Sequence, residues 1–215
     1  MIENKDIIVI GIQPWDIPIG SNCKDIAKQF SKENRVLYVN NPISYIDFFK
    51  DPNSQKTKNR KEAIANPEKA LYQEDSNLWV YTPPLKTFPV NFVSSNGLFT
   101  VLNKVNNKKF ANAIKTAIEK LGFKDFILFN DQNMFLGYYL KEQLNPEKYI
   151  YYVRDNLLNV PYWKKHGNKI EPELISKADM VFTNSLLYEE NAKQYNEKSI
   201  ITPIYFILFC RIITN

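Results

Sequence analysis

The feature that most constrains the fold of this chain is a repeated alternation of short apolar segments with longer amphipathic ones. The first apolar segment is DIIVIG at 6–11, and RVLYVN at 35–40 repeats the pattern. Between them, residues 22–33 place apolar side chains at helical spacing. Continuous apolar runs of this length are typical of strands buried on both faces of a parallel sheet. The first forty residues therefore predict one right-handed β-α-β unit.

The alternation continues almost to the end of the chain. Further strands are expected at 77–81, 125–130, 148–153, 180–183 and 199–202. Further helices are expected at 96–121, 133–144, 171–177 and 186–195. In the longest of these helices, Leu98, Leu102, Val105 and Ile114 belong to the expected apolar stripe. The pattern predicts an α/β fold, Rossmann-like and doubly wound, with a mostly parallel sheet of about seven strands.

Two segments depart from the alternation. Residues 50–76 are polar, and we expect an exposed and mobile excursion there. At the other end, the sequence after Pro203 reads IYFILFCRIITN, with no turn residues and no polar face. We therefore interpret residues 204–215 as an aberrant apolar tail, which needs a partner surface to be stable.

Composition narrows the classes of function. The 28 Lys and Arg residues against 23 Asp and Glu give a net charge of +5, and the lysines are spread along the chain. This distribution argues against a nucleic-acid partner. Cys23 and Cys210 have no metal-ligand spacing and are expected to be free thiols. The charged N-terminus and the shortness of the apolar run at 204–210 predict a cytoplasmic protein. Contact with the inner face of the membrane stays open.

Polar residues follow the expected strands at what should be one edge of the sheet. They are Asn130, Asp155 with its neighbour Arg154, Asn184 and Ser185. Each has an ordinary explanation as a turn or cap residue, but ligands bind at the carboxyl ends of parallel strands. Asp155 is the candidate catalytic residue, as a base or as a partner of a sugar hydroxyl. The alternative is that it forms only an ion pair or a cap.

The loop after the first strand does not match the nucleotide-binding fingerprints. Eight residues separate Gly11 from Gly20, so the G-x-G-x-x-G pattern is missing, and no Gly-Lys-Ser/Thr triplet occurs. Gly20 precedes a helix N-terminus, which favours an anion, although it could also serve only a tight turn. Trp15 is either a cover over the sheet edge or a platform for an acceptor. His166, the only histidine, is expected at the surface, and no metal site is expected.

Three segments together resemble a known family. They are DIIVIGIQPWDIPIGSNCKDIAKQFSKENRVLYVNNP at 6–42, YIYYVRDNLLNVPYW at 149–163 and ELISKADMVFTNSLLYEENAKQYNEKSI at 173–200. Their order and spacing resemble bacterial glycosyltransferases of the family 4 type, the group that includes teichuronic acid and capsular polysaccharide transferases. The resemblance implies a GT-B fold, in which two Rossmann-like domains face each other across a cleft. It also implies that the N-terminal domain holds the acceptor and that no catalytic metal is needed.

What the resemblance implies for this chain follows by position. Residues 1–203 would be the N-terminal, acceptor-side domain, and the donor domain that should follow would be absent. Gly20 would lie near the donor phosphates and Asp155 near the reacting carbon. Asn184 and Ser185 would line the cleft, and Trp15 and Asn130 complete the predicted substrate-binding residues.

The implied activity is that of a hexosyltransferase that acts in cell-envelope polysaccharide biosynthesis. It would move a sugar from a nucleotide-sugar to a cell-surface polysaccharide or a lipid-linked acceptor, with no cofactor beyond that donor. The fragment alone is expected to have little or no activity, because positioning both substrates supplies much of catalysis. The alternative is a non-catalytic subunit that binds a glycan or a partner. A nicotinamide-dependent oxidoreductase is disfavoured by the missing glycine fingerprint.

Overall fold

The computed structural model describes residues 2–17 and 20–202. Its strands are β1 (Asp6–Gly11), β2 (Arg35–Val39), β3 (Ile43–Ser44), β4 (Leu71–Asp75), β5 (Leu78–Tyr81), β6 (Lys86–Thr87), β7 (Ile127–Asp131), β8 (Lys148–Val153), β9 (Met180–Thr183) and β10 (Ser199–Ile201). Its α-helices are α1 (Asn22–Phe30), α2 (Tyr45–Lys50), α3 (Gln55–Ala65), α4 (Asn96–Leu121), α5 (Leu140–Leu144), α6 (Pro161–Lys177) and α7 (Leu186–Lys193). Short 3-10 helices are η1 (Pro67–Lys69), η2 (Val90–Phe92) and η3 (Leu157–Asn159).

Eight strands form the central sheet, in the order β10-β9-β8-β7-β1-β2-β5-β4. All neighbouring strands in it are parallel except β4, which pairs antiparallel with β5 at the edge. Strands β3 and β6 form a separate parallel pair. The order reverses between β1 and β7, so the carboxyl ends of these two strands mark the switch point at which α/β folds bind ligands. The predicted fold class is confirmed.

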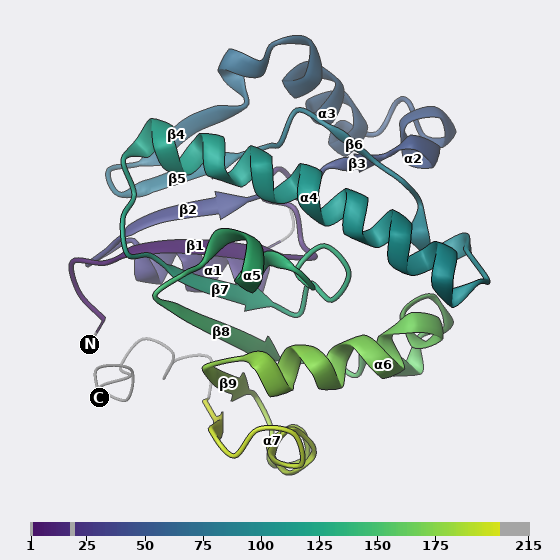
Figure 1. Ribbon diagram of the computed structural model, residues 1–215. Coiled ribbons are helices and arrows are strands. Elements are labelled where there is room, and N and C mark those ends of the chain that lie inside the picture. The colour runs from purple at the N-terminus through teal and green to yellow at the C-terminus, as the bar shows by residue number, and fades with distance from the viewer. Residues whose placement is uncertain (1, 18–19, 203–215) are drawn as a thin grey trace.

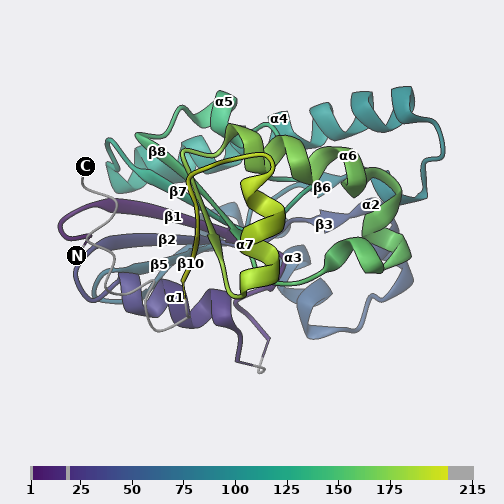
Figure 2. The same cartoon turned by 90° about the horizontal axis from the view of Figure 1, so that it is seen from below.

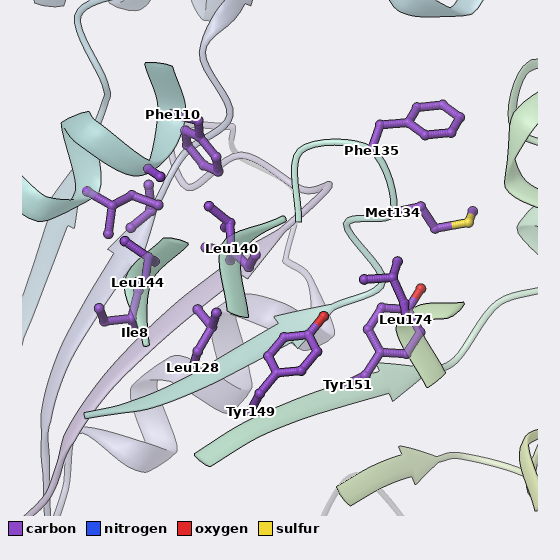
Figure 3. Packing of buried hydrophobic residues seen from close by; sticks show 14 of the residues in the cluster. Ile8, Phe110, Leu128, Met134, Phe135, Leu140, Leu144, Tyr149, Tyr151 and Leu174 are labelled. Atoms are coloured by element: carbon purple, nitrogen blue, oxygen red, sulfur yellow. The ribbon is translucent and has the colours of Figure 1, made fainter. Parts of the chain in front are cut away.

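Helices cover both faces of the sheet (Figures 1 and 2). Helices α4, α5 and α6 lie on one face and α1 on the other. Figure 3 shows the first layer, where Phe110 of α4 and Leu140 and Leu144 of α5 pack near Ile8 and Leu128 of the sheet. The central strands are therefore buried on both sides, which explains why their sequences are apolar without alternation.

The expectation for residues 50–76 holds for their exposure but not for their backbone, which forms regular elements. This segment contains α3, η1 and β4, and Ser54 caps α3 by accepting a hydrogen bond from the amide of Thr57 at 3.3 Å. Arg60 of α3 is completely buried and pairs with Asp16 of the first loop. Because most other side chains of the segment are exposed, its sequence is polar even though its backbone is ordered into regular elements.

Helix α6 begins ten residues earlier than predicted, at Pro161 rather than near Glu171. Proline is favourable in the first turn of a helix, where its missing N–H has no partner to lose. Gly167 is tolerated inside the helix because it faces Met134 and Leu158, and any Cβ there would lie 2.8 Å from a methyl carbon of Leu158. Helix α5, in contrast, is shorter than predicted, since residues 134–139 form turns and the helix itself begins at Leu140.

Helix α4 has the predicted bounds, and its C-terminal half buries Ile114 of the predicted stripe, but its N-terminal half does not bury the predicted face. In its N-terminal half, Leu98 and Val105 are 52% and 38% exposed. The side chains that this half buries are instead Phe99, Asn103, Asn106 and Asn107. Figure 1 shows the reason, because this half of α4 extends beyond the carboxyl ends of the strands of the central sheet.

The apolar tail at 204–215, including Cys210, lies outside the described residues. Among the residues that are described, no helix is both long enough and apolar enough to cross a bilayer.

Candidate functional site

The carboxyl ends of β7 and β8 hold Asp155 in a defined position. Gln132, the residue after β7, accepts hydrogen bonds from the amides of Arg154 at 3.3 Å and Asp155 at 3.0 Å. Its own amide donates to the carbonyl of Asp155 at 2.7 Å and to Glu171 of α6 at 2.9 Å. Gln132 adopts a positive φ of 52°, which is a strained conformation for a residue other than glycine. One buried side chain thus fixes the backbone on both sides of the candidate catalytic residue.

The carboxylate of Asp155 is both paired and accessible. Its side chain is 50% exposed and lies 3.0 Å from the guanidinium of Arg154. Arg154 also donates to the fully buried Asp131 at 2.8 Å. Burial lowers the pKa of Arg154, but the two carboxylates outweigh it and hold this pKa above its usual value. The predicted ion pair is therefore present, and it leaves half of the Asp155 side chain free to meet a ligand.

Cys23 lies near this ion pair and is completely buried and unreactive. Burial, followed by the nearby Asp131, raises the pKa of the Cys23 thiol well above its usual value. A side chain at Gly11 would lie 2.7 Å from the sulfur of Cys23, so glycine is needed there for space. Thiols with a raised pKa are poor nucleophiles, and Cys23 is a packing residue.

The first loop is anchored from two sides. The backbone amide of Trp15 donates to the side chain of Asn40 at 2.6 Å, and its ring packs edge-on against Tyr38 with centroids 5.0 Å apart. Trp15 is 8% exposed. It packs at the end of β2, and little of its surface is left for contact with a substrate.

Gly20 is exposed and directly precedes Ser21, which caps α1 by accepting a hydrogen bond from the amide of Lys24 at 3.3 Å. A Cβ at position 20 would meet nothing within 4 Å, and its φ is not positive. Neither space nor backbone geometry requires glycine here.

The remaining predicted residues serve the local structure. Asn130 is completely buried and donates to the hydroxyl of Tyr149 at 2.9 Å. Asn184 donates to the carbonyl of Arg154 at 2.9 Å, which joins the ends of β8 and β9. Ser185 caps α7 through a hydrogen bond from the amide of Tyr188 at 3.3 Å. Asn184 is exposed and Ser185 partly exposed at the carboxyl edge, whereas Asn130 has no exposed surface. Their roles in substrate binding stay predictions.

The expectation of a surface histidine is wrong. His166 is 6% exposed, its ring stacks on Phe99 with centroids 3.8 Å apart, and its Nε2 lies 2.9 Å from the carbonyl of Val93. It became buried because α6 starts early and carries it against η2 and α4. Within residues 2–17 and 20–202, no three His, Cys, Asp or Glu side chains gather in a group that could hold a metal ion.

Sequence reasoning missed a cleft of about 220 Å³ beside this edge. Its walls come from the ends of β2 and β7, the segment around η2, the N-terminal half of α4 and the start of α6. Its lining includes the amides Asn41, Asn91, Asn103, Asn106 and Asn133 and the aromatic residues Phe88, Phe92, Phe135, Tyr162 and Trp163. A signal was available in α4, where asparagines at 103, 106 and 107 share one helical face despite their poor helix propensity.

The cleft and the Asp155 loop are joined by two consecutive residues. Gln132 holds the backbone at Asp155, and Asn133 lines the cleft. Asn133 in turn donates a hydrogen bond of 2.7 Å to the side chain of Asn41, which follows β2 and also lines the cleft. The candidate catalytic carboxylate and the cleft are therefore parts of one edge and share one supporting loop.

This architecture is similar to that of solved glycosyltransferases. A chain of sucrose-phosphate synthase from Thermosynechococcus elongatus, a GT-B glycosyltransferase, matches with a TM-score of 0.51 and 12% identity, over 93% of this chain and 88% of that one. The chain described here has a glycosyltransferase-like fold. A second chain of the same synthase matches with a TM-score of 0.52 and 14% identity, over 93% of this chain and 48% of that one.

The likeness concerns the fold alone, since the identity is low. This chain spans about half the length of the second synthase chain. No protein family matches the sequence, and no curated protein matches it either.

Proposed function

We propose that this chain forms the acceptor-side domain of a GT-B glycosyltransferase of the family 4 type. Such a transferase moves a hexose from a nucleotide-sugar to a cell-surface polysaccharide or a lipid-linked acceptor. The observation that carries the proposal is the carboxyl edge of the sheet, where a half-exposed carboxylate and a cleft lined by amides and aromatic rings share one loop. Amides and aromatic rings suit a sugar ring, which has hydroxyl groups at its edge and apolar C–H faces.

The proposed division of labour follows from the same edge. Asp155 is the candidate base for the acceptor hydroxyl, and the N-terminus of α1 after Gly20 is the candidate position for the donor phosphates. Asn184 and Ser185, which follow β9 at the same edge of the sheet, would line the cleft between the two proposed domains. The donor itself binds mainly to a second Rossmann-like domain, in line with the GT-B resemblance. No metal ion or further cofactor takes part in the proposed reaction.

Exposed apolar side chains support a lipid-linked acceptor. Phe92 and Tyr162 at the cleft are 68% and 51% exposed, and Leu98 and Val101 of the neighbouring α4 are 52% and 59% exposed. The exposed Lys104 and Lys108 lie on the same helix. Apolar and cationic groups together fit the surface of an anionic membrane, where a lipid-linked acceptor would be presented. The proposed location is therefore the cytoplasmic face of the membrane.

The test is transfer of radiolabelled sugar from a panel of nucleotide-sugars to the lipid and polysaccharide fractions of membranes from the source cells. The purified chain alone should incorporate little or no label, because the proposed donor-binding domain is needed to position both substrates. Extracts that contain the tagged chain and also supply that donor domain should incorporate label, and Asp155→Asn should reduce incorporation by about 100-fold or more if the carboxylate is the base. The matched control is Asp25→Asn on the exposed side of α1, which should change nothing. Equal incorporation with and without the chain, for every donor, would contradict the transferase proposal. Retention of a glycan or a second protein without incorporation would instead favour the non-catalytic binding subunit.

A further inference from the structure

The amide groups of the cleft differ in how they are paired. Asn106 exchanges two hydrogen bonds of 2.8 Å with the backbone of Phe88, and Asn133 donates to Asn41 at 2.7 Å. Asn103, one helical turn from Asn106, is 1% exposed and lines the same cleft. Neither its oxygen nor its nitrogen has a hydrogen-bond partner within the part of the chain that the structure describes.

An unpaired buried amide is costly, so Asn103 needs an explanation. Leaving one buried polar group without a partner costs about 1–3 kcal/mol, and Asn103 leaves a donor group and an acceptor unsatisfied. The rest of α4 shows that this face can pair its amides, since Asn107 makes hydrogen bonds of 2.8 Å to the carbonyls of Asn103 and Phe135. An amide left unpaired beside paired neighbours calls for a partner outside the chain, such as a water molecule or a ligand.

The charge of the cleft indicates what kind of ligand it takes. Its lining contains one carboxylate, Asp47, and one ammonium group, Lys56, and both belong to exposed side chains. The buried part of the lining consists of amides, Thr87 and apolar or aromatic groups. A charged ligand would lose its hydration there without gaining an opposite charge, which is strongly unfavourable. A neutral ligand with several hydroxyl groups would lose little and would satisfy Asn103.

The size of the cleft sets a further limit. Its volume of about 220 Å³ is below the range of about 300–1,000 Å³ that is usual for drug-sized ligands. A complete nucleotide-sugar exceeds such a cleft, whereas one six-membered sugar ring does not. Aromatic side chains are available for the apolar face of that ring, with the rings of Phe135 and Trp163 5.1 Å apart in the wall.

We infer that this cleft binds one neutral hexopyranose unit of the acceptor and that Asn103 recognises it through hydrogen bonds to its hydroxyl groups. The inference rests on the proposed function and makes it more specific, because it excludes a uronic acid or a phosphorylated sugar as the unit bound here. It also assigns Asn103 as a specificity residue of the acceptor and not as a catalytic residue.

The test is direct binding of small sugars to the purified full chain, measured by saturation-transfer NMR. The probes are the methyl α-D-hexopyranosides of glucose, galactose and mannose, with D-glucuronate as an anionic probe of similar size. At least one neutral hexopyranoside should bind with a millimolar Kd, and D-glucuronate should bind at least tenfold more weakly, a difference of about 1.4 kcal/mol. Tighter binding of D-glucuronate, or binding of none of the probes, would overturn the inference.

Variants of α4 locate the binding. Asn103→Leu removes both hydrogen-bonding groups at nearly constant side-chain volume and should raise the Kd of the neutral hexopyranoside at least tenfold. Asn103→Asp keeps the shape of the side chain but removes its N–H donors, and it should also raise the Kd at least tenfold. If one of the two variants fails to fold, the other still tests the inference. Asn112→Leu, on the exposed side of the same helix, should leave binding unchanged. If both Asn103 variants bind the hexopyranoside as well as wild type, the sugar binds without Asn103 and the inference fails.

The outcome is independent of the transferase assay. Binding that depends on Asn103, without any transfer of label, would support the inference and count against the transferase. Transfer of label with an acceptor KM that Asn103→Leu leaves unchanged would overturn the inference and leave the transferase intact.

Discussion

The two halves of α4 share one helix but serve different purposes. The C-terminal half lies on the sheet and buries Phe110, Ala111, Ile114 and Ala117. The N-terminal half extends past the strand ends and buries Asn103, Asn106 and Asn107, while Leu98 and Val101 face outward. The C-terminal half of the helix stabilises the fold by burying apolar side chains, and the N-terminal half forms a wall of the cleft. A helix therefore changes from scaffold to site where the layer beneath it ends.

The largest expected effect tests the scaffold half. Phe110 is completely buried against the sheet (Figure 3), and Phe110→Ala should destabilise the chain by about 3–5 kcal/mol, because it removes apolar contacts and leaves a cavity. Urea unfolding measures the change. The control is Val101→Ala in the other half, which should alter stability by less than about 0.5 kcal/mol, as is usual for exposed positions. Similar losses for both variants would mean that the two halves are packed alike.

The next effect concerns a paired asparagine in the site half. Asn107 is completely buried and donates to two carbonyls, and it accepts from the amide of Tyr139 at 3.1 Å. Asn107→Leu should cost about 2–3 kcal/mol, since the backbone groups of Phe135 and Tyr139 lose their partner. The readout is again the urea midpoint. A neutral result would show that water replaces these hydrogen bonds and that Asn107 is no more structural than Asn103.

Asn103 should behave in the opposite way. Asn103→Leu replaces an unpaired buried amide by an apolar group of similar size. The free energy of unfolding should therefore increase, or decrease by less than about 1 kcal/mol. Gaining stability while losing a ligand is the behaviour expected of a functional position. A loss as large as that of Asn107→Leu would place Asn103 in the scaffold and remove the contrast.

The smallest expected effect concerns Glu171 of α6, a buried polar side chain that is paired, as Asn107 is. Burial raises the pKa of Glu171, although hydrogen bonds from Gln132 and Tyr151 oppose it. The folded chain therefore keeps the proton of Glu171 to a higher pH than the unfolded chain, and its stability falls as the pH rises from about 4.3, the ordinary value for glutamate. Glu171→Gln should unfold a few degrees higher than wild type near neutral pH and show no such advantage in acid. Exposed Glu119→Gln on α4 is the control. A constant difference between wild type and Glu171→Gln at every pH would refute the raised pKa.

The strands could be predicted because the residues of each strand show by themselves that it is buried. DIIVIG and KYIYYV became β1 and β8 with the predicted bounds, since a strand covered on both faces needs only a continuous apolar run. The positions of Asp155, Asn184 and Ser185 at one edge followed from the same strands, because parallel strands bring their carboxyl ends together. The helix N-cap at Ser21 likewise reflects a local preference, that of a serine side chain for the position before a helix.

The sequence by itself thus determined the layer order, the parallel sheet and the edge at which a ligand would bind. The tertiary structure decided which polar residues at that edge are free to meet a ligand. Asn130, predicted to bind substrate, is enclosed and paired with Tyr149, while Asn103 of α4 lines the cleft and has no hydrogen-bond partner among the described residues. Whether an amide is paired depends on residues that lie far away in the chain, and a local pattern carries no record of them.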